Sequence, residues 1–331
     1  MAKVRLSVIA GFAAAGLALT ACTNTEGDDA ASTAAADVET VTIEDNHGTQ
    51  EVPVDPETVV SLDNRTFEVL ADWGVELEAA PVALIPDTIE AYAGNEDILN
   101  IGNHREPDLE LITAAEPDFI LQGQRFTNYY DDIAELNPDA AYVDLNVRDG
   151  EPIDQELKRQ VTELGKVFET EDEAEQLIAD FDAALERAQE AYDSSKTVMA
   201  VNVSGGEIGY IAPGVGRMYG PLFDLVGMTP SLEVEGSSSN HEGDDISVEA
   251  IAQSNPDILL VMDRDAAVQS VDQESYAGAA ALINENPALQ NVTALNEDAV
   301  YIAPGDTYTN ESIITYTEIL NGMADLFESQ Q

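Results

Sequence analysis

The sequence predicts an α/β protein of two Rossmann-like lobes joined by a single long helix. Residues 110–125 recur at 249–264 as the ungapped pattern E-x-I-x4-P-D-x-x-L-x3-R, and the second copy begins 139 residues after the first. Internal duplication of this kind indicates two related halves. Strand and helix patterns alternate through both halves, which is typical of parallel sheets covered by helices. Between the copies, residues 173–192 form one amphipathic helical pattern that no Gly or Pro interrupts.

The elements of the first half follow from apolar periodicity and from turn residues. In chain order we expect a hairpin at 38–54, a buried strand at 58–62, a helix at 67–73 that Gly74 ends, the helix of the first repeat copy, and buried strands at 119–121 and 142–145. Asp108 is the expected N-cap of the repeat helix, and Pro117-Asp118 is expected to end that helix.

Two helices, at 154–168 and 173–192, are expected next, and the second of them lies between the two halves. In the second half we expect a strand at 197–203, a Gly-rich stretch, a helix at 221–226 that Gly227 ends, the second repeat copy, a strand at 300–303 and a C-terminal helix from about residue 311. The chain therefore divides into a targeting peptide (1–21), a tether (22–37), an N-terminal lobe (38–168), an inter-lobe helix (169–194) and a C-terminal lobe (195–331).

Charge narrows the class of partner. The 331 residues include 13 Lys and Arg against 65 Asp and Glu, a net charge of −52. Proteins that bind nucleic acid carry basic patches, so this balance excludes nucleic acid as a partner and argues against adhesion to anionic lipid. The simplest interpretation is a solvated acidic surface, and adaptation to saline surroundings is an alternative.

The N-terminus has the pattern of a bacterial targeting peptide. Lys3 and Arg5 precede an apolar stretch at 6–19, whose 14 residues are short for a membrane span. The stretch ends L-T-A-C at Cys22, which resembles a lipobox whose cysteine is lipidated. Cys22 is the only cysteine, so no internal disulfide can form. Removal of residues 1–21 leaves 11 basic and 65 acidic residues, a net charge of −54.

Three arginines are candidate ligand-binding residues. Arg125 and Arg264 are expected to end the matching strands of the two repeat copies, and open α/β sheets bind ligands at the carboxyl ends of strands. Arg217 lies in the loop A-P-G-V-G-R-M-Y, just before a helix. The guanidinium is a permanent, planar cation suited to anions. The sequence therefore indicates an anion-binding cleft, with ordinary surface ion pairs as the alternative.

Four further residues are candidates for chemistry or docking. His241 and Tyr308 lie in polar loops and offer nitrogen and oxygen donors that suit iron, although loop residues of these types are often simply solvated. Glu110 and Glu249 open matching helices, where the helix dipole already favours an acid; a matched pair for a partner with two basic spots is the functional alternative. The sequence contains no Walker motif, no H-E-x-x-H and no legible Ser-His-Asp order.

Taken together, six blocks of sequence resemble a known family. They are T-V-V-S-L-D, I-G-N-H-R-E-P-D-L-E, G-Q-R-F-T-N-Y-Y, A-P-G-V-G-R, D-I-S-V-E-A-I and V-M-D-R-D-A-A-V. From about Val38 to the C-terminus the chain resembles the substrate-binding lipoproteins of iron-siderophore ABC importers, most closely those of the enterobactin and petrobactin type. The resemblance implies the class III periplasmic-binding-protein fold.

The resemblance also implies roles for the candidate residues. Arg125, Arg217 and Arg264 would surround a trianionic ferric tris-catecholate, and His241 and Tyr308 would bind Fe(III) directly only when the siderophore is tetradentate. Glu110 and Glu249 would dock on arginines of an ABC permease. One departure is Asp265, which follows Arg264 where a small residue is usual.

The expected protein is a monomer that is not an enzyme, held at the extracytoplasmic face of the cell membrane by its lipid anchor alone. Its cargo would be an Fe(III)-siderophore, with no cofactor. The alternatives are a haem or cobalamin binder of the same fold, a lipid-anchored hydrolase and an acidic adhesin.

Overall fold

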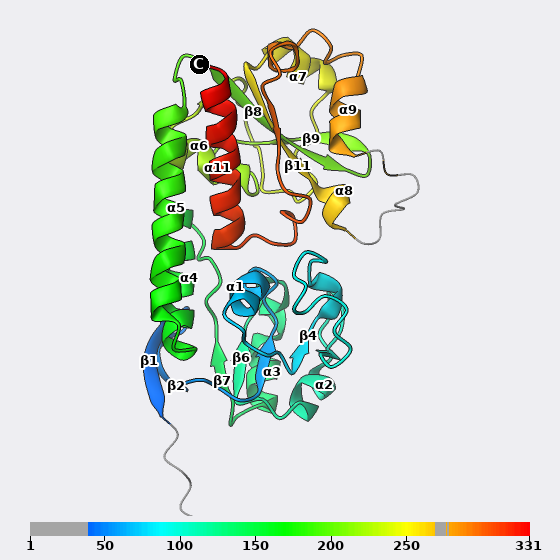
Figure 1. The fold of residues 1–331 in the computed structure, drawn as a ribbon. Coiled ribbons are helices and arrows are strands. Elements are labelled where there is room, and N and C mark those ends of the chain that lie inside the picture. Colours follow the sequence, from blue (N-terminus) through cyan, green and yellow to red (C-terminus); the bar gives the residue numbers. More distant parts are fainter. Residues whose placement is uncertain (1–38, 269–275, 277) are drawn as a thin grey trace, which may run out of the picture. The chain divides into compact units, whose positions relative to one another are not determined.

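The structure, a computed structural model, describes residues 39–268, 276 and 278–331. The expected targeting peptide, Cys22 and the tether lie outside the described residues. Val38–Gln331 forms one compact unit, in which two five-stranded sheets form the centres of two lobes (Figure 1). Among the described residues, no helix has the length and apolarity needed to cross a bilayer.

The N-terminal lobe contains a parallel sheet in the order β5-β4-β3-β6-β7. Its strands are β3 (Val59–Ser61), β4 (Ala79–Ala80), β5 (Leu99–Asn100), β6 (Phe119–Leu121) and β7 (Ala141–Val143). The helices of this lobe are α1 (Phe67–Asp72), α2 (Leu109–Ala114) and α3 (Tyr130–Leu136), with two 3-10 segments, η1 (Val82–Leu84) and η2 (Gln124–Tyr129). The hairpin β1 (Thr40–Asp45) and β2 (Gly48–Pro53) precedes them, as the alternating pattern predicts.

The C-terminal lobe has a sheet in the order β10-β8-β11-β12, with β9 added antiparallel to β8. The strands are β8 (Thr197–Ser204), β9 (Glu207–Ile211), β10 (Thr229–Pro230), β11 (Ile258–Asp263) and β12 (Val300–Ile302). The helices are α6 (Tyr219–Val226), α7 (Val248–Ser254), α8 (Arg264–Ala267), α9 (Ala279–Glu285), α10 (Thr293–Asn296) and α11 (Ile313–Ser329). Alternate residues of β8 enter separate cores: Val198 and Ala200 face one, Met199 and Val201 the other.

Two long helices connect the lobes in sequence, α4 (Ile153–Val167) and α5 (Glu171–Ala191) (Figure 1). Helix α5 packs against α4 and along α11, and its Phe181 is fully buried in a core that also contains residues of α4 and of the C-terminal lobe. The amphipathic pattern at 173–192 therefore predicts this helix to within about two residues at its start. The domain boundaries drawn from the sequence remain predictions.

The repeat is visible in the backbone as well as in the sequence. Asp108 caps α2 by accepting the N–H of Leu111, and Ser247 caps α7 in the same way. The residues that precede the two Pro-Asp pairs, Glu116 and Asn255, both have positive φ, at 49° and 46°. A turn of this kind directs each chain from its helix into the following strand.

The two Pro-Asp aspartates have equivalent partners. Asp118 accepts the N–H of Thr58 at 2.9 Å, just before β3, and Asp257 accepts the N–H of Thr197 at 2.8 Å, at the start of β8. Each aspartate thus ties together the amino ends of two neighbouring strands of its lobe. The two copies of the repeat therefore share this contact between strands.

Some elements were not anticipated. The two-residue strands β4 and β5 are too short to give a periodic signal, and β9 lies in the Gly-rich stretch for which the sequence predicted no element. The arginines also lie just beyond their strands: β6 ends at Leu121, so Arg125 is within η2, and β11 ends at Asp263, so Arg264 begins α8.

Candidate ligand-binding site

A cleft separates the two lobes at the carboxyl ends of their strands. One cavity of about 460 Å³ contains Arg125 from the N-terminal lobe and Arg264 and Tyr308 from the C-terminal lobe. Its full lining is Ala83, Leu84, His104, Arg105, Arg125, Arg264, Ala267, Val268, Tyr308 and Thr309. The structure therefore brings together two of the three predicted arginines and the predicted tyrosine.

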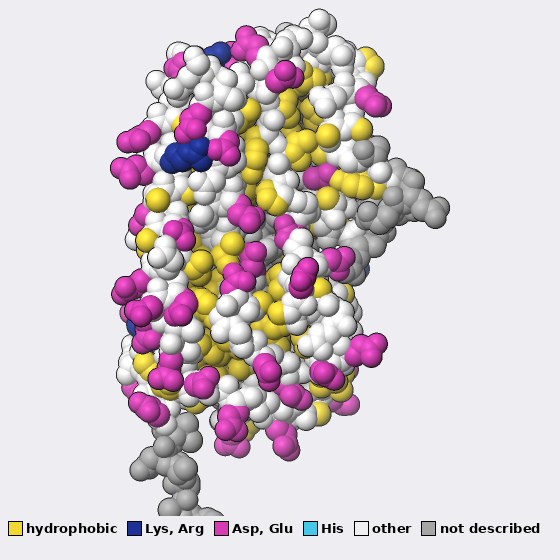
Figure 2. Space-filling model, viewed as in Figure 1, with side chains coloured by type: hydrophobic (Ala, Val, Ile, Leu, Met, Phe, Trp, Pro, Cys, Tyr) yellow, Lys and Arg dark blue, Asp and Glu magenta, His cyan; other side chains and the backbone are white. Residues whose placement is uncertain are grey.

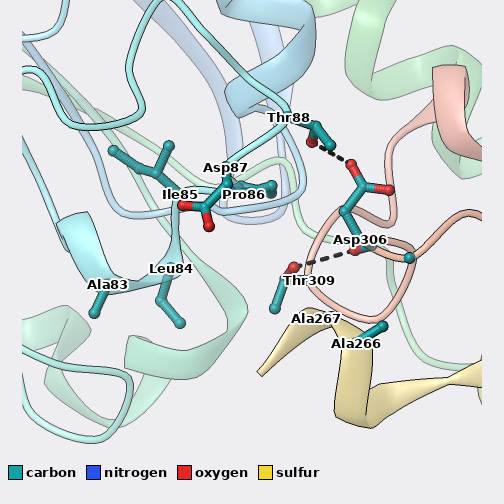
Figure 3. A pocket seen from close by; sticks show the side chains of 11 residues that line it. Ala83, Leu84, Ile85, Pro86, Asp87, Thr88, Ala266, Ala267, Asp306 and Thr309 are labelled. Carbon is teal, nitrogen blue, oxygen red and sulfur yellow. Dashed lines mark hydrogen bonds between the residues drawn. The ribbon is translucent and has the colours of Figure 1, made fainter. Parts of the chain in front are cut away.

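A second cavity of about 490 Å³ adjoins the first and shares Ala83, Leu84, Ala267 and Thr309 with it. Figure 3 shows the loop from Ala83 to Thr88 facing Asp306 and helix α8 across this space. The Thr88 hydroxyl donates to the Asp306 carboxylate, and the Thr309 hydroxyl donates to the Asp306 carbonyl. One hydrogen bond thus spans the cleft directly.

The guanidinium groups of Arg125 and Arg264 retain unused donors. Among the described residues, the Nε atoms of both are buried and lack a hydrogen-bond partner, while Arg264 Nη1 donates to the Ser204 hydroxyl at 3.1 Å. Buried polar groups in native proteins are nearly always satisfied, so unpaired guanidinium nitrogens beside a cavity suit an anionic ligand. Figure 2 shows the contrast with one outer face, where Asp and Glu side chains are spread widely and Lys and Arg are few.

Backbone packing brings Arg125 to the cleft. Gly123, two residues earlier, lies so close to β3 that a Cβ there would stand 1.8 Å from the Leu62 carbonyl oxygen. Only glycine permits this approach, which turns the chain from β6 into η2. The position of Arg125 thus depends on the absence of a side chain at Gly123.

Tyr308 lies among the predicted arginines. The guanidinium carbon of Arg217 is 4.2 Å from the centre of the Tyr308 ring, and that of Arg264 is 5.0 Å away. Cation–π attraction favours both contacts. Arg217 also occupies a strained turn, in which Met218 has φ 58° and ψ −70° and the Tyr219 N–H donates to the Arg217 carbonyl at 2.7 Å.

Arg217 is already paired with a carboxylate, which the sequence did not reveal. Its Nε donates to one oxygen of Glu311, and Arg65 of the N-terminal lobe donates to the other oxygen at 2.6 Å. Glu311 is 5% exposed. Burial would raise the pKa of Glu311, but Arg217 and Arg65 outweigh burial and hold that pKa at about 2. This buried ion triad joins the two lobes behind Tyr308.

The carboxylate of Asp265, the residue after Arg264, is bound by two backbone N–H groups. Its two oxygens accept the N–H groups of Gly205 at 2.8 Å and Gly206 at 2.9 Å, and the side chain is 3% exposed. Both glycines have positive φ. The departure noted in the sequence is therefore accommodated by a turn that binds the aspartate.

The structure does not bring His241 into contact with Tyr308 among the described residues. Its side chain is 55% exposed, with Nε2 3.8 Å from Glu242 Oε1, and its carbonyl accepts from Asn202. Its neighbours Asn240 and Glu242 line a third cavity, which meets the first at Arg264. Among the described residues, no hydrogen bond or ring contact joins His241 to Tyr308.

Sequence reasoning missed His104 and Arg105, which line the first cavity. Burial, and then Arg105, Arg125 and Arg264, lower the pKa of His104. Its Nε2 accepts a hydrogen bond from Arg105 Nε at 3.1 Å. Both residues follow β5, and a correct prediction of that two-residue strand would have placed them at the edge of the sheet where ligands bind.

The two predicted docking acids occupy equivalent exposed positions. Glu110 lies in the first turn of α2 and Glu249 in the first turn of α7, each two residues after the cap. The helix dipole alone explains an acid at these positions. Their docking role remains a prediction.

Comparison with known proteins agrees with the fold. The family described as "Periplasmic binding protein" matches residues 59–307. The chain is 27% identical over 295 residues to the ferric-anguibactin-binding protein FatB of Vibrio anguillarum, covering 87% of this chain and 88% of that protein. It is 24% identical over 289 residues to the petrobactin-binding protein YclQ of Bacillus subtilis, covering 86% of each.

A solved structure is similar along most of its length. The TroA-like periplasmic binding protein of Xylanimonas cellulosilytica superimposes with a TM-score of 0.71 at 30% identity, covering 84% of this chain and 91% of that one. The predicted fold class and family resemblance are thus confirmed. The chain belongs to the periplasmic binding protein family.

Proposed function

We propose that this protein captures an Fe(III)-siderophore outside the cytoplasm and delivers it to an ABC importer. The observation that carries the proposal is the cavity that Arg125 and Arg264, from different lobes, line together with Tyr308, where the Nε of each arginine has no hydrogen-bond partner among the described residues. The names of two relatives, a ferric-anguibactin binder and a petrobactin binder, support iron complexes as the cargo. The ligand is bound and released, and no bond in it is made or broken.

The ligand we propose is a ferric catecholate, because its negative charge matches the cavity. A protein with a net charge of −54 after removal of residues 1–21 repels anions at long range, but charges beyond about 8 Å are largely screened at physiological salt. Clustered guanidinium groups in a partly dry cleft then decide the local potential. Tyr308 is the proposed direct iron ligand for tetradentate siderophores, with His241 as its partner if the loop that carries it moves toward the cavity.

The remaining assignments complete the proposal. Cys22, after removal of residues 1–21, would carry the lipid anchor, so that the lobes 38–168 and 195–331 and the helix 169–194 function as a monomer at the outer face of the membrane. Glu110 and Glu249 would contact basic residues of the permease, one from each lobe. Their equivalent positions in α2 and α7 support this pairing.

The test is a thermal-shift panel followed by titration. We expect ferric catecholates to raise the melting temperature more than ferric hydroxamates, haem or cobalamin, because a ligand that binds only the native state stabilises it. In fluorescence titrations, Arg125→Ala and Arg264→Ala should each weaken binding by about 1.5–3 kcal/mol, the range for hydrogen bonds to charged groups. A shift with haem or cobalamin alone, or unchanged affinity in both variants, would reject the proposal.

A further inference from the structure

The basic residues of this chain divide into two groups, according to whether a carboxylate neutralises them. The described residues contain 11 Lys and Arg. Eight of these have a nitrogen within 3.4 Å of an Asp or Glu oxygen: Arg65, Arg148, Lys158, Arg159, Lys166, Arg187, Lys196 and Arg217. In the described part of the chain, Arg105, Arg125 and Arg264 have no such partner. All three line the same 460 Å³ cavity.

This coincidence is informative because acidic residues are so abundant. With 65 carboxylates, a cation placed at random acquires a partner easily, as eight of the 11 do. Because no described carboxylate pairs with these three cations, the cavity that they line has a positive local potential. Their mutual repulsion is relieved when an anion binds between them.

The charge of Arg217, by contrast, is neutralised by a carboxylate of the protein itself. It donates to Glu311 and, at 3.0 Å, to the Tyr308 carbonyl oxygen. Its guanidinium lies over the Tyr308 ring, its side chain is 15% exposed, and it is absent from the lining of the cavity. An anion in the cavity therefore meets Tyr308 before it meets Arg217.

Arg105 is held at the cleft by a compact turn. Gly102 and Pro107 form a bridge, and Gly102 has φ 123°, where a Cβ would stand 2.6 Å from the Glu106 carbonyl oxygen. The Asn103 side chain accepts the N–H of Arg105 at 2.9 Å, and His104 accepts from the Arg105 guanidinium. In the part of the chain that the structure describes, Asn103 and His104, not a carboxylate, position the backbone and the side chain of Arg105.

We propose that Arg105 is the third guanidinium that contacts the anionic ligand, in the role that the family resemblance gives to Arg217. The site then carries one positive charge from each of Arg105, Arg125 and Arg264, which matches in magnitude and opposes in sign the three negative charges of a ferric tris-catecholate. This assignment rests on the proposed function, because it names the residues that recognise the same ligand.

The test compares Arg105→Gln with Arg187→Gln, which removes the same charge far from the cleft, where Arg187 pairs with Asp325 and Glu328. Binding of a hexadentate ferric tris-catecholate is measured by fluorescence quenching, after melting curves confirm that both variants fold. Arg105→Gln should raise the Kd about tenfold, the lower end for a charged hydrogen bond because Arg105 is exposed. Arg187→Gln should change the Kd less than twofold.

A second ligand and a third variant sharpen the result. The ratio of the Arg105→Gln Kd to the wild-type Kd should be much smaller for a neutral ferric tris-hydroxamate than for the trianion. Arg105→Lys should recover part of the trianion affinity, because it keeps the charge and loses the planar fork. If Arg105→Gln binds the trianion as the wild type and Arg187→Gln do, the assignment of Arg105 is wrong while the proposed function stands. If the wild type binds no ferric complex, the proposed function fails and the assignment fails with it.

Discussion

The substitution Glu311→Gln tests how much the ion triad of Arg65, Arg217 and Glu311, which joins the two lobes, contributes to the free energy of unfolding. Glu311 is 5% exposed and bonds to Arg65 of the N-terminal lobe and Arg217 of the C-terminal lobe. Glutamine keeps the shape but has one acceptor oxygen and no charge, so both guanidinium groups lose the carboxylate that they share. Removal of one partner from a buried pair costs about 3–5 kcal/mol.

The pKa of Glu311 gives an independent magnitude. The arginines lower it from 4.5 to about 2. Since one pKa unit corresponds to about 1.4 kcal/mol, this shift amounts to about 3–4 kcal/mol of stability. Because the folded-state pKa is depressed, this stability is present above pH 4.5 and is lost as the pH falls toward 2. A loss of about 3–4 kcal/mol is therefore expected at neutral pH.

The assay is chemical denaturation followed by circular dichroism, at pH 7.5 and at a series of values down to pH 2.5. The control is Glu328→Gln, which removes a carboxylate from a solvent-exposed pair with Arg187 and should leave the free energy of unfolding nearly unchanged. The difference between wild type and Glu311→Gln should narrow as the pH falls below 4.5. A loss under about 1 kcal/mol at pH 7.5, or a difference that does not change with pH, would refute this reasoning.

Three further predictions concern other described residues. Burial raises the pKa of Asp63 from 3.8 to about 6, so the contribution of Asp63 to stability is greatest below pH 3.8 and is lost as the pH rises through 6. Asp63→Asn should therefore flatten the dependence of the unfolding free energy on pH between 3.8 and 6, measured by denaturation at a series of pH values. A variant with the same pH dependence as the wild type would contradict this prediction. Gly123→Ala should lower the melting temperature and weaken ferric catecholate binding, because its Cβ would overlap the Leu62 carbonyl, and a variant with wild-type affinity would show that Arg125 does not depend on this turn. Glu110→Arg and Glu249→Arg should abolish siderophore uptake by cells while purified protein keeps its Kd, and normal uptake by both variants would exclude the docking role.

Much of the site was accessible from the sequence because duplication repeats a local pattern. Arg125 and Arg264 occupy equivalent places after β6 and β11, and both reach the same cavity. Asp108 and Ser247 cap matching helices as their residue types indicate. His104 and Arg105 escaped because β5, the strand before them, has only two residues and so gives no periodic signal.

Asp265 illustrates a different limit. Its position after Arg264 raised the question of how a negative charge is tolerated beside an anion site. The answer is two backbone N–H groups of Gly205 and Gly206, 60 and 59 residues earlier in the chain. No local pattern connects these residues, because they meet only through the pairing of β8 with β11.

Local pattern was sufficient for the alternation of strands and helices, the long helix α5 and the candidate arginines, since hydrophobic periodicity and capping act over a few residues. Folding in three dimensions decided which of the arginines keep their charge free. Any of 65 carboxylates could neutralise a given cation, and the choice depends on which side chains the packed lobes bring within a few ångströms. Arg217 thus lies beside Glu311, while Arg105, Arg125 and Arg264 line the cavity with no carboxylate partner among the described residues.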